Sequence, residues 1–243
     1  MLADTPVVRT SLEGKLLRLT LTRAEKRNAL NLALCRAIVH AVDEAIPARV
    51  GCILLDAEGP VFCAGMDLGE SVYANPQELA EAHERLFTMN RWARVPIVAA
   101  VQGRAIAGGT GLVAQAHIVV ADEAAQFGLT EIRIGMWPMV VYRSVEAAIG
   151  ERRTLEWSLT GRLVGAEEAQ TAGLAHQIGP AKRAEDIAVE IAGRGADAID
   201  YGMRYYSGSR ELGIAEAGEL AARLRMELMA TPGYLAAASS YKR

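Results

Sequence analysis

Two glycine-bearing turns, each placed directly after an apolar segment of strand character, constrain this chain more than any other feature. The first turn reads FCAGMDL over residues 62–68, and the second reads AIAGGTGL over residues 105–112. Because glycine has no Cβ, the backbone at such turns can come close to another backbone or to a ligand. If the Met66 N–H and the Gly108 N–H converge, they form an oxyanion hole, and a helix that starts near Gly109 adds its dipole.

Strand-like and helix-like segments alternate along the first part of the chain. Residues 16–22 read as a strand, and residues 32–45 have helical periodicity with Asn31 as the N-cap. The pattern also predicts strands over 50–56, 97–101 and 117–121, a loop over 69–77 and a helix over 78–92. Strands that alternate with helices pair mostly in parallel, so we expect an α/β fold.

After residue 150 the alternation of strand-like and helix-like segments gives way to mostly helical segments. The segments there favour helix, with one extended stretch over 174–178; the expected helices are 151–160, 166–172, 184–194 and 211–230. We therefore divide the chain into a core over residues 1–180, which binds the ligand and carries the chemistry, and a helical C-terminal region over residues 181–243.

Composition narrows the classes of partner and compartment. A net charge of −3 and a pI near 5.9 give no field that attracts nucleic acid or an anionic membrane, so we expect neither as a partner. The cysteines Cys35, Cys52 and Cys63 are odd in number and lack metal-ligand spacing, which predicts reduced thiols, no metal site and a cytoplasmic location. Residues 1–10 include Asp4 and no apolar stretch, so we expect no leader peptide.

Two other interpretations of the turns stay open at this point. The turns can simply connect strands and helices of an α/β fold, without a functional role. Alternatively, Gly109, Gly111 and Ala114 fit the dinucleotide-binding pattern G-x-G-x-x-A after a strand. That pattern requires an acidic residue about 20 positions further on, whereas Asp122 comes too soon.

Further motifs in a fixed order give these turns a family context. The segment FGLTE over residues 127–131 follows the second turn, RAEKRNALN over 23–31 precedes the first, and LTGRLVGAEEA over 159–169 leads into Gly173-Leu174. Together they resemble the crotonase (enoyl-CoA hydratase/isomerase) superfamily over most of residues 7–180. The resemblance implies a ClpP-like spiral of ββα units with a helical C-terminal trimerisation region, hence a homotrimer or hexamer. It also implies an acyl-CoA substrate from fatty acid metabolism and no cofactor beyond that coenzyme A.

The resemblance also assigns roles to individual residues. Met66 and Gly108 donate their N–H groups to the thioester oxygen, and Glu131 carries the proton. Ala64 contacts the adenine through its backbone, and Lys26 and Arg27 lie near the nucleotide. The other residues implied in acyl-CoA binding are Ala29, Gly65, Asp67, Leu68 and Gly109. For Asp67 we favour a role in holding its loop over a role in catalysis.

The wall of the acyl pocket is predicted from the segment after Gly135. Trp137, Met139 and Tyr142 are its candidate lining, with core packing as an equal alternative. Met139 replaces a glycine that is common after this proline in the family. No acidic residue follows Gly135 closely, so the segment lacks the nucleophilic aspartate of dehalogenase-like members.

The sequence departs from the hydratase pattern at one informative position. Hydratases of this family usually hold and activate water with two glutamates, but the first of these positions is Gly111, and only Glu131 remains. A single carboxylate with a raised pKa can move one proton between two carbons of an enolate, as in Δ3,Δ2-enoyl-CoA isomerases. We therefore favour an isomerase. The alternative functions are a hydratase and a non-catalytic acyl-CoA-binding or interaction module. The alternative role for Glu131 is a surface ion pair with Arg133. Of the histidines, we keep only His83 as a remote acid/base candidate.

Overall fold

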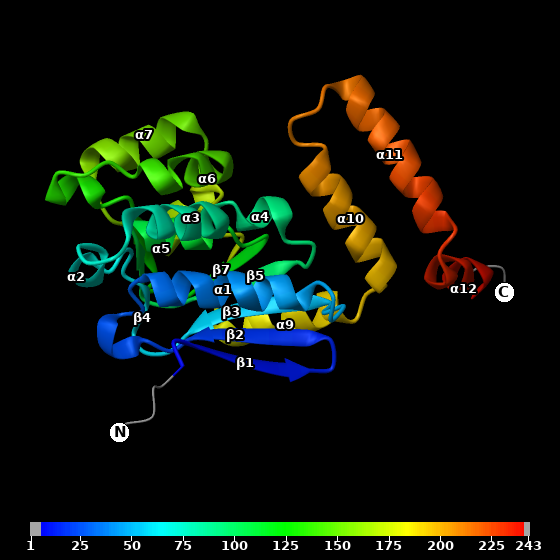
Figure 1. Cartoon of the computed structure of the whole chain (residues 1–243), viewed down its shortest axis with the longest axis horizontal. Helices are drawn as coiled ribbons and strands as arrows, with labels where there is room; N and C mark the ends of the chain where they lie inside the picture. Colours follow the sequence, from blue (N-terminus) through cyan, green and yellow to red (C-terminus); the bar gives the residue numbers. More distant parts are fainter. Residues whose placement is uncertain (1–5, 241–243) are drawn as a thin grey trace.

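The computed structural model describes residues 6–240 and shows a mixed α/β architecture (Figure 1). Within these residues the larger sheet has the strand order β1-β2-β3-β5-β7-β10, and the smaller sheet has the order β4-β6-β8-β9. The larger sheet contains β1 (Val8–Glu13), β2 (Leu16–Leu21), β3 (Cys52–Ala57), β5 (Ile97–Val101), β7 (Ile118–Ala121) and β10 (Gln177–Ile178). The smaller sheet contains β4 (Val61–Cys63), β6 (Arg104–Ile106), β8 (Gln126–Gly128) and β9 (Val164–Gly165).

Parallel pairing dominates both sheets, as the alternation of strands and helices predicts. Only β1 with β2 and β8 with β9 pair antiparallel among the described strands. The central strands β3 and β5 of the larger sheet are largely buried on both faces, whereas the edge strand β1 is largely exposed. Successive residues of a strand point to opposite faces, so each face of a central strand packs against different elements. Ile53 and Leu55 belong to the main core, whereas Leu54 packs with Ile187 of α9 (Ala181–Ala192) on the other face.

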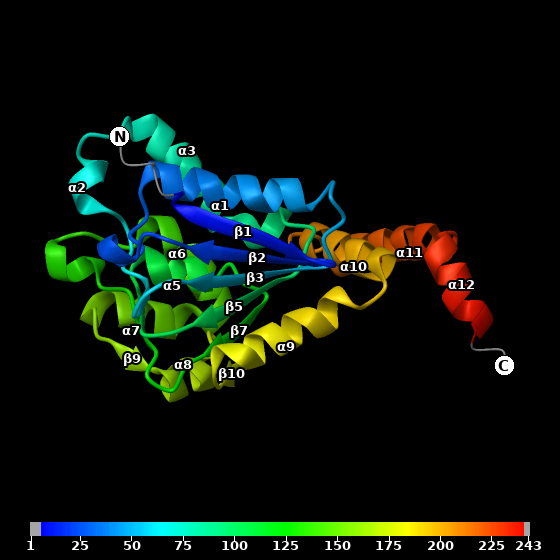
Figure 2. The same ribbon diagram turned by 90° about the horizontal axis from the view of Figure 1, so that it is seen from below.

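The helices surround the sheets and continue beyond them. Those of the body are α1 (Leu32–Ala45), α2 (Leu68–Ser71), α3 (Pro76–Phe87), α4 (Met89–Trp92), α5 (Gly108–Val113), α6 (Met139–Ile149), α7 (Glu151–Thr160), α8 (Ala166–Ala172) and α9. Two short 3₁₀ helices are η1 (Ala24–Lys26) and η2 (Glu131–Ile134). Figure 2, a view from below, shows α9 running along the larger sheet. The division predicted at residue 180 stays a prediction, and α9, which directly follows it, covers the sheet.

The last three helices form an arm beside the sheet-containing body (Figures 1 and 2). They are α10 (Ala196–Gly208), α11 (Ile214–Met229) and α12 (Pro232–Ser240). Ion pairs join the arm to the body, among them Arg91 to Glu211 at 2.6 Å and Arg49 to Asp197 at 2.8 Å. Together with α9, the arm makes up the described part of the helical C-terminal region that the sequence predicts over residues 181–243. The expected trimeric or hexameric state stays a prediction.

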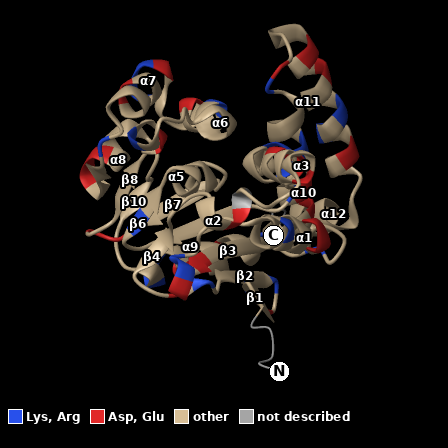
Figure 3. Cartoon of the chain, turned by 60° about the vertical axis from the view of Figure 1, so that its left-hand side comes forward, with Lys and Arg blue, Asp and Glu red and all other residues tan. Residues whose placement is uncertain are grey.

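Charged residues of both signs are interspersed along the outer helices, as Figure 3 shows for α7 and α11. On α11, for example, Arg223 lies 3.9 Å from Glu227. Among residues 6–240, no helix combines the length and the apolar character needed to cross a membrane. Residues 1–5, which include the Asp4 used in predicting the absence of a leader, lie outside the described residues.

Several predicted boundaries are wrong, and capping explains most of the differences. The predicted loop over 69–77 contains α2 and the start of α3, because Asp67 and Asn75 each accept backbone N–H groups as N-caps. The predicted helix over 78–92 is divided at Thr88, whose backbone is not helical. By contrast, α1 has the predicted bounds, and its N-cap Asn31 accepts the Leu34 N–H at 2.9 Å. Strand β1 and helices α6, α10 and α12 were not predicted.

Candidate active site

The two glycine-bearing turns come together because their strands are neighbours. The first turn follows β4, the second connects β6 to α5, and β4 pairs in parallel with β6. Parallel neighbours end at the same edge of a sheet, so the turns that leave them meet there. Cys63 lies opposite Ala105 in this pairing, which places Gly65 beside Gly108.

The contact between the turns is so close that it requires glycine. Gly65 has a φ of +86°, and a Cβ there would lie 2.9 Å from the Cβ of Ala107 and 3.2 Å from the Gly108 nitrogen. A Cβ on Gly109 would lie 2.2 Å from the carbonyl oxygen of Cys63. Contacts under 3.0 Å force something to shift, so side chains at these positions would push the turns apart.

The Met66 and Gly108 N–H groups lie side by side, as the oxyanion-hole prediction requires. A Cβ on Gly108 would lie only 3.6 Å from the Met66 nitrogen. Gly108 begins α5, so its N–H has no acceptor within the helix. Within residues 6–240 neither N–H donates to a protein acceptor, while the flanking Asp67 N–H donates to Leu30 at 2.9 Å. Both residues line the same cavity and their N–H groups have no acceptor within residues 6–240; their binding of a thioester oxygen remains a prediction.

Hydrogen bonds tie the end of β8 to the second turn. The Ala107 N–H donates to the Gly128 carbonyl at 2.8 Å. The Thr110 hydroxyl, which is fully buried, donates to the Ala105 carbonyl at 2.7 Å and accepts the Gly128 N–H at 3.1 Å. Sequence reasoning missed Thr110, although a buried hydroxyl next to glycines is a signal for such a role. This network fixes where the chain beyond β8, and therefore Glu131, lies relative to the turns.

Glu131 is a largely buried carboxylate with an unpaired oxygen. It opens η2, which ends at Ile134 and is capped by Gly135 with a φ of +73°. Its Oε2 is buried and has no hydrogen-bond partner among the described residues. Burial raises the pKa of Glu131 above its ordinary value, an effect that a hydrogen bond from its own backbone N–H partly opposes. No described ion pair joins it to Arg133, so the pairing considered from the sequence is absent from the structure.

Arg23 and Asp67 hold the first turn in place. Arg23 is buried and reaches Asp67 at 3.1 Å and Glu70 at 2.8 Å, and it also donates to the Ala29 carbonyl. Asp67 accepts the Glu70 N–H at 3.2 Å as the N-cap of α2. Burial alone would raise the pKa of Asp67, but the Glu70 N–H and Arg23 outweigh it and hold that pKa below its ordinary value. These contacts agree with a loop-holding role for Asp67.

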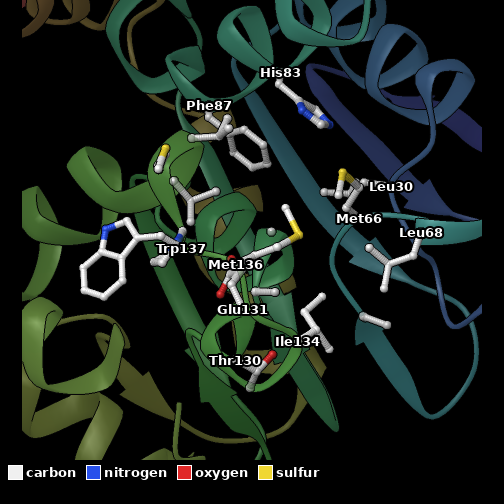
Figure 4. A pocket seen from close by; sticks show the side chains of 17 residues that line it. Leu30, Met66, Leu68, His83, Phe87, Thr130, Glu131, Ile134, Met136 and Trp137 are labelled. Carbon is white, nitrogen blue, oxygen red and sulfur yellow. The ribbon is translucent and has the colours of Figure 1, made fainter. Parts of the chain in front are cut away.

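A cavity of about 250 Å³ opens in front of Glu131 and the paired turns (Figure 4). The residues from the predicted site that line it are Ala64, Met66, Leu68, Gly108, Glu131, Trp137 and Met139. Those that do not line it are Lys26, Arg27, Ala29, Gly65, Asp67 and Gly109. Tyr142 also lies outside this lining and stacks on Trp137 with ring centroids 6.1 Å apart. Phe87, Met136 and Val141 also line this cavity and were not identified by sequence reasoning.

The basic residues Lys26 and Arg27 lie near the first turn but outside the cavity. Both are exposed, and within residues 6–240 no ion pair engages either of them. The Arg27 carbonyl accepts the Ala64 N–H at 3.0 Å, which fixes this segment beside the turn. Arg27 has a φ of +54°, in the left-handed region. An anionic group bound at the turn would therefore have two cations nearby that form no ion pair within the described part of the chain.

We expect a double Lys26→Gln, Arg27→Gln variant to bind acyl-CoA more weakly, with a larger loss at low salt than at high salt. Exposed charges are screened over about 10 Å at 0.1 M ionic strength, so the gap should shrink as salt rises. Calorimetric Kd values at two salt concentrations measure this. Lys15→Gln with Arg225→Gln is the matched control, since it removes two exposed charges elsewhere. Binding that ignores both mutation and salt would mean that these residues do not meet the phosphates.

The pKa of Glu131 predicts opposite effects of pH on activity and stability. The ionised form accepts the proton, so turnover should fall as pH drops through the raised pKa. Because folding raises the pKa of Glu131, its protonated form stabilises the folded protein. This stabilisation is complete below the pKa of the unfolded chain, near 4.5, and is lost as pH rises through the pKa of the folded protein. Glu131→Gln should therefore gain stability relative to wild type as pH rises from 4.5 through the raised pKa of the folded state, as urea unfolding would show. A gap that does not change with pH would contradict the raised pKa.

This arrangement of two sheets, paired turns and a helical arm is the crotonase fold. Residues 12–218 match the sequence model of the family described as enoyl-CoA hydratase/isomerase. The enoyl-CoA hydratase EchA19 of Mycobacterium tuberculosis is 34% identical to this chain, over 74% of this chain and 70% of the relative. The 2,3-dehydroadipyl-CoA hydratase of Escherichia coli is 30% identical, over 76% of this chain and 73% of the relative. The crystal structure of an enoyl-CoA hydratase from Mycobacterium smegmatis superposes with a TM-score of 0.91 at 25% identity, covering 98% of this chain and 96% of that one.

The chain belongs to the enoyl-CoA hydratase/isomerase family, within the crotonase superfamily. The resemblance noted from the sequence motifs is thereby confirmed, and so is the fold that it implies. Members of this family act on acyl-CoA thioesters, which agrees with an apolar cavity bordered by unpaired N–H donors and a carboxylate.

Proposed function

We propose that this protein is an enoyl-CoA isomerase that moves a double bond by a single-carboxylate proton shuttle. Glu131 takes a proton from C2 of a 3-enoyl-CoA, and the enolate oxygen accepts hydrogen bonds from the Met66 and Gly108 N–H groups. Glu131 then returns the proton to C4, so the double bond moves from C3–C4 to C2–C3. One proton leaves and one returns, and the reaction needs no metal or redox cofactor. Residues 6–240 contain no group of three His, Cys, Asp or Glu residues that could hold a metal.

The observation that carries this proposal is the packing at Gly111. A Cβ there would lie 2.3 Å from Cγ1 and 2.6 Å from Cβ of Val141, and 3.2 Å from a ring carbon of Phe87. Val141 is a buried residue of α6 that also lines the cavity. The space that a second glutamate would occupy in a hydratase is therefore filled by an apolar side chain. Glu131 is left without a carboxylate partner with which to hold water.

The experiment that tests the reaction is incubation with 2-enoyl-CoA and 3-enoyl-CoA in deuterated water, with products analysed by mass. An isomerase interconverts the two and exchanges protons at C2 and C4 without a gain of water. A hydratase adds water to the 2-enoyl-CoA instead. The relatives named above are called hydratases, which makes rapid hydration without isomerisation the outcome that would overturn the proposal.

Restoring the missing carboxylate should fail unless Val141 is removed as well. We expect Gly111→Glu to destabilise the protein by at least about 1–3 kcal/mol, since it overpacks the contact between α5 and α6 and buries a charge. Adding Val141→Gly should recover part of that loss and raise water addition relative to isomerisation. Gly218→Glu is the control and should leave stability nearly unchanged, because this exposed helical glycine has nothing within 4 Å of where a Cβ would lie. Unfolding in urea gives the stabilities, and a Gly111→Glu protein as stable as wild type would contradict the packing argument.

A further inference from the structure

His83 is a polar side chain of the cavity that the proposed reaction does not use. It lies on the buried face of α3, and only 8% of its surface is exposed. Figure 4 shows its ring pointing into the cavity next to Phe87, while Glu131 reaches in from the other side. The imidazole is therefore withdrawn from bulk solvent but open to a ligand in the cavity.

The ring of His83 has no hydrogen-bond partner among the described residues, unlike the histidines with a structural role. The Nδ1 atoms of His117 and His176 accept the backbone N–H groups of Ile97 at 3.0 Å and Val119 at 3.1 Å. His40 is exposed to solvent. His83 contacts the ring of Phe87, with centroids 5.7 Å apart, and within residues 6–240 no hydrogen bond or ion pair engages it. No hydrogen bond from the described residues holds the ring, and its nitrogens are not among the fully buried unpaired atoms, so they stay accessible from the cavity.

The surroundings define which chemical group this imidazole can bind. Burial lowers the pKa of His83, so the ring is neutral near pH 7 and offers one N–H donor and one nitrogen acceptor. The neighbouring lining is apolar and includes Leu30, Met66 and Phe87, and no Lys or Arg among the described residues lines the cavity. A plain hydrocarbon chain beside the ring would leave both groups unpaired, which is unfavourable. A carboxylate would lack a cation to neutralise it.

We propose that His83 selects acyl chains that carry an uncharged hydrogen-bonding oxygen, a hydroxyl or a carbonyl, beyond the reacting double bond. Either group can pair with a neutral imidazole, a hydroxyl through donor or acceptor and a carbonyl through the N–H. His83 is then a specificity-determining residue. The placement of the acyl chain in this cavity rests on the proposed function, whereas the choice among acyl chains rests on His83.

Binding of saturated acyl-CoAs tests this without turnover, because they contain no double bond to move. The probes are chains of one length, either plain or carrying a single hydroxyl or keto group at successive positions from C4 outward. Calorimetry should show wild type binding at least one oxygenated chain about tenfold more tightly than the plain chain. His83→Leu should remove this preference while keeping the affinity for the plain chain, and His83→Gln should retain part of it. His40→Leu, an exposed histidine outside the cavity, is the matched control and should keep the full preference.

The outcomes separate this inference from the proposed reaction. Equal binding of all chains, or a preference that survives His83→Leu, overturns the inference even if wild type isomerises 3-enoyl-CoA. A preference lost in His83→Leu supports it, even if no isomerisation is found and the proposed reaction fails. An equal loss of affinity for plain and oxygenated chains in His83→Leu would indicate a packing role and would also overturn it. A wild-type protein that binds no acyl-CoA overturns both.

Discussion

Glu131→Gln is expected to abolish C2 proton exchange and double-bond migration, with a loss of about 10²–10⁴-fold or more in kcat, while acyl-CoA affinity stays nearly intact. The amide keeps the shape of the side chain but cannot accept the proton. Rates of deuterium incorporation from deuterated water measure the chemical step directly, and calorimetric titration with a saturated acyl-CoA measures binding.

The control for this substitution is Glu123→Gln, which neutralises an exposed carboxylate in the segment before β8. It should leave exchange and migration unchanged. If Glu131→Gln retained full activity, Glu131 would have no role as proton carrier in either isomerisation or hydration. A loss of affinity as large as the loss of rate would instead assign Glu131 to substrate binding.

Substitutions at Gly108 should have the next largest effect, and they should be graded by size. A Cβ at this position lies 3.2 Å from Leu30 Cδ1 and 3.6 Å from the Met66 nitrogen, so Gly108→Ala is crowded but can be accommodated by a small shift. Compared with Gly108→Ala, Gly108→Val adds two methyl groups beside the Met66 and Gly108 N–H groups. Loss of one oxyanion-hole donor lowers kcat by about 10²–10³-fold, which we expect for valine, with a smaller loss for alanine.

Steady-state kinetics with 3-enoyl-CoA, together with urea unfolding, separates a catalytic effect from misfolding. Gly218→Val places the same side chain at an exposed helical glycine and should keep wild-type turnover. Unchanged turnover in a folded Gly108→Val protein would show that these N–H groups do not bind the thioester oxygen.

Features that depend on neighbouring residues can be predicted from the sequence. Asn31 as the N-cap of α1 follows from the local preference of asparagine for that position, and the strands of the parallel sheet follow from apolar runs between helices. The glycines at 65 and 109 indicated close backbone approach before any contact was known, and the structure shows what approaches them. The family also follows from motifs whose order along the chain is visible in the sequence.

Which side chains share the cavity, and which spaces are filled, depends on how elements distant in sequence pack together. Val141 and Gly111 are 30 positions apart, and their contact depends on how α6 packs on α5. His83, which the sequence supports only as a remote acid/base candidate, lines the cavity. Tyr142, a candidate lining residue from the sequence, lies outside the lining and stacks on Trp137. Local preference fixes helices, strands and caps, but the direction of a side chain across an interface is set by the packing of elements distant in sequence.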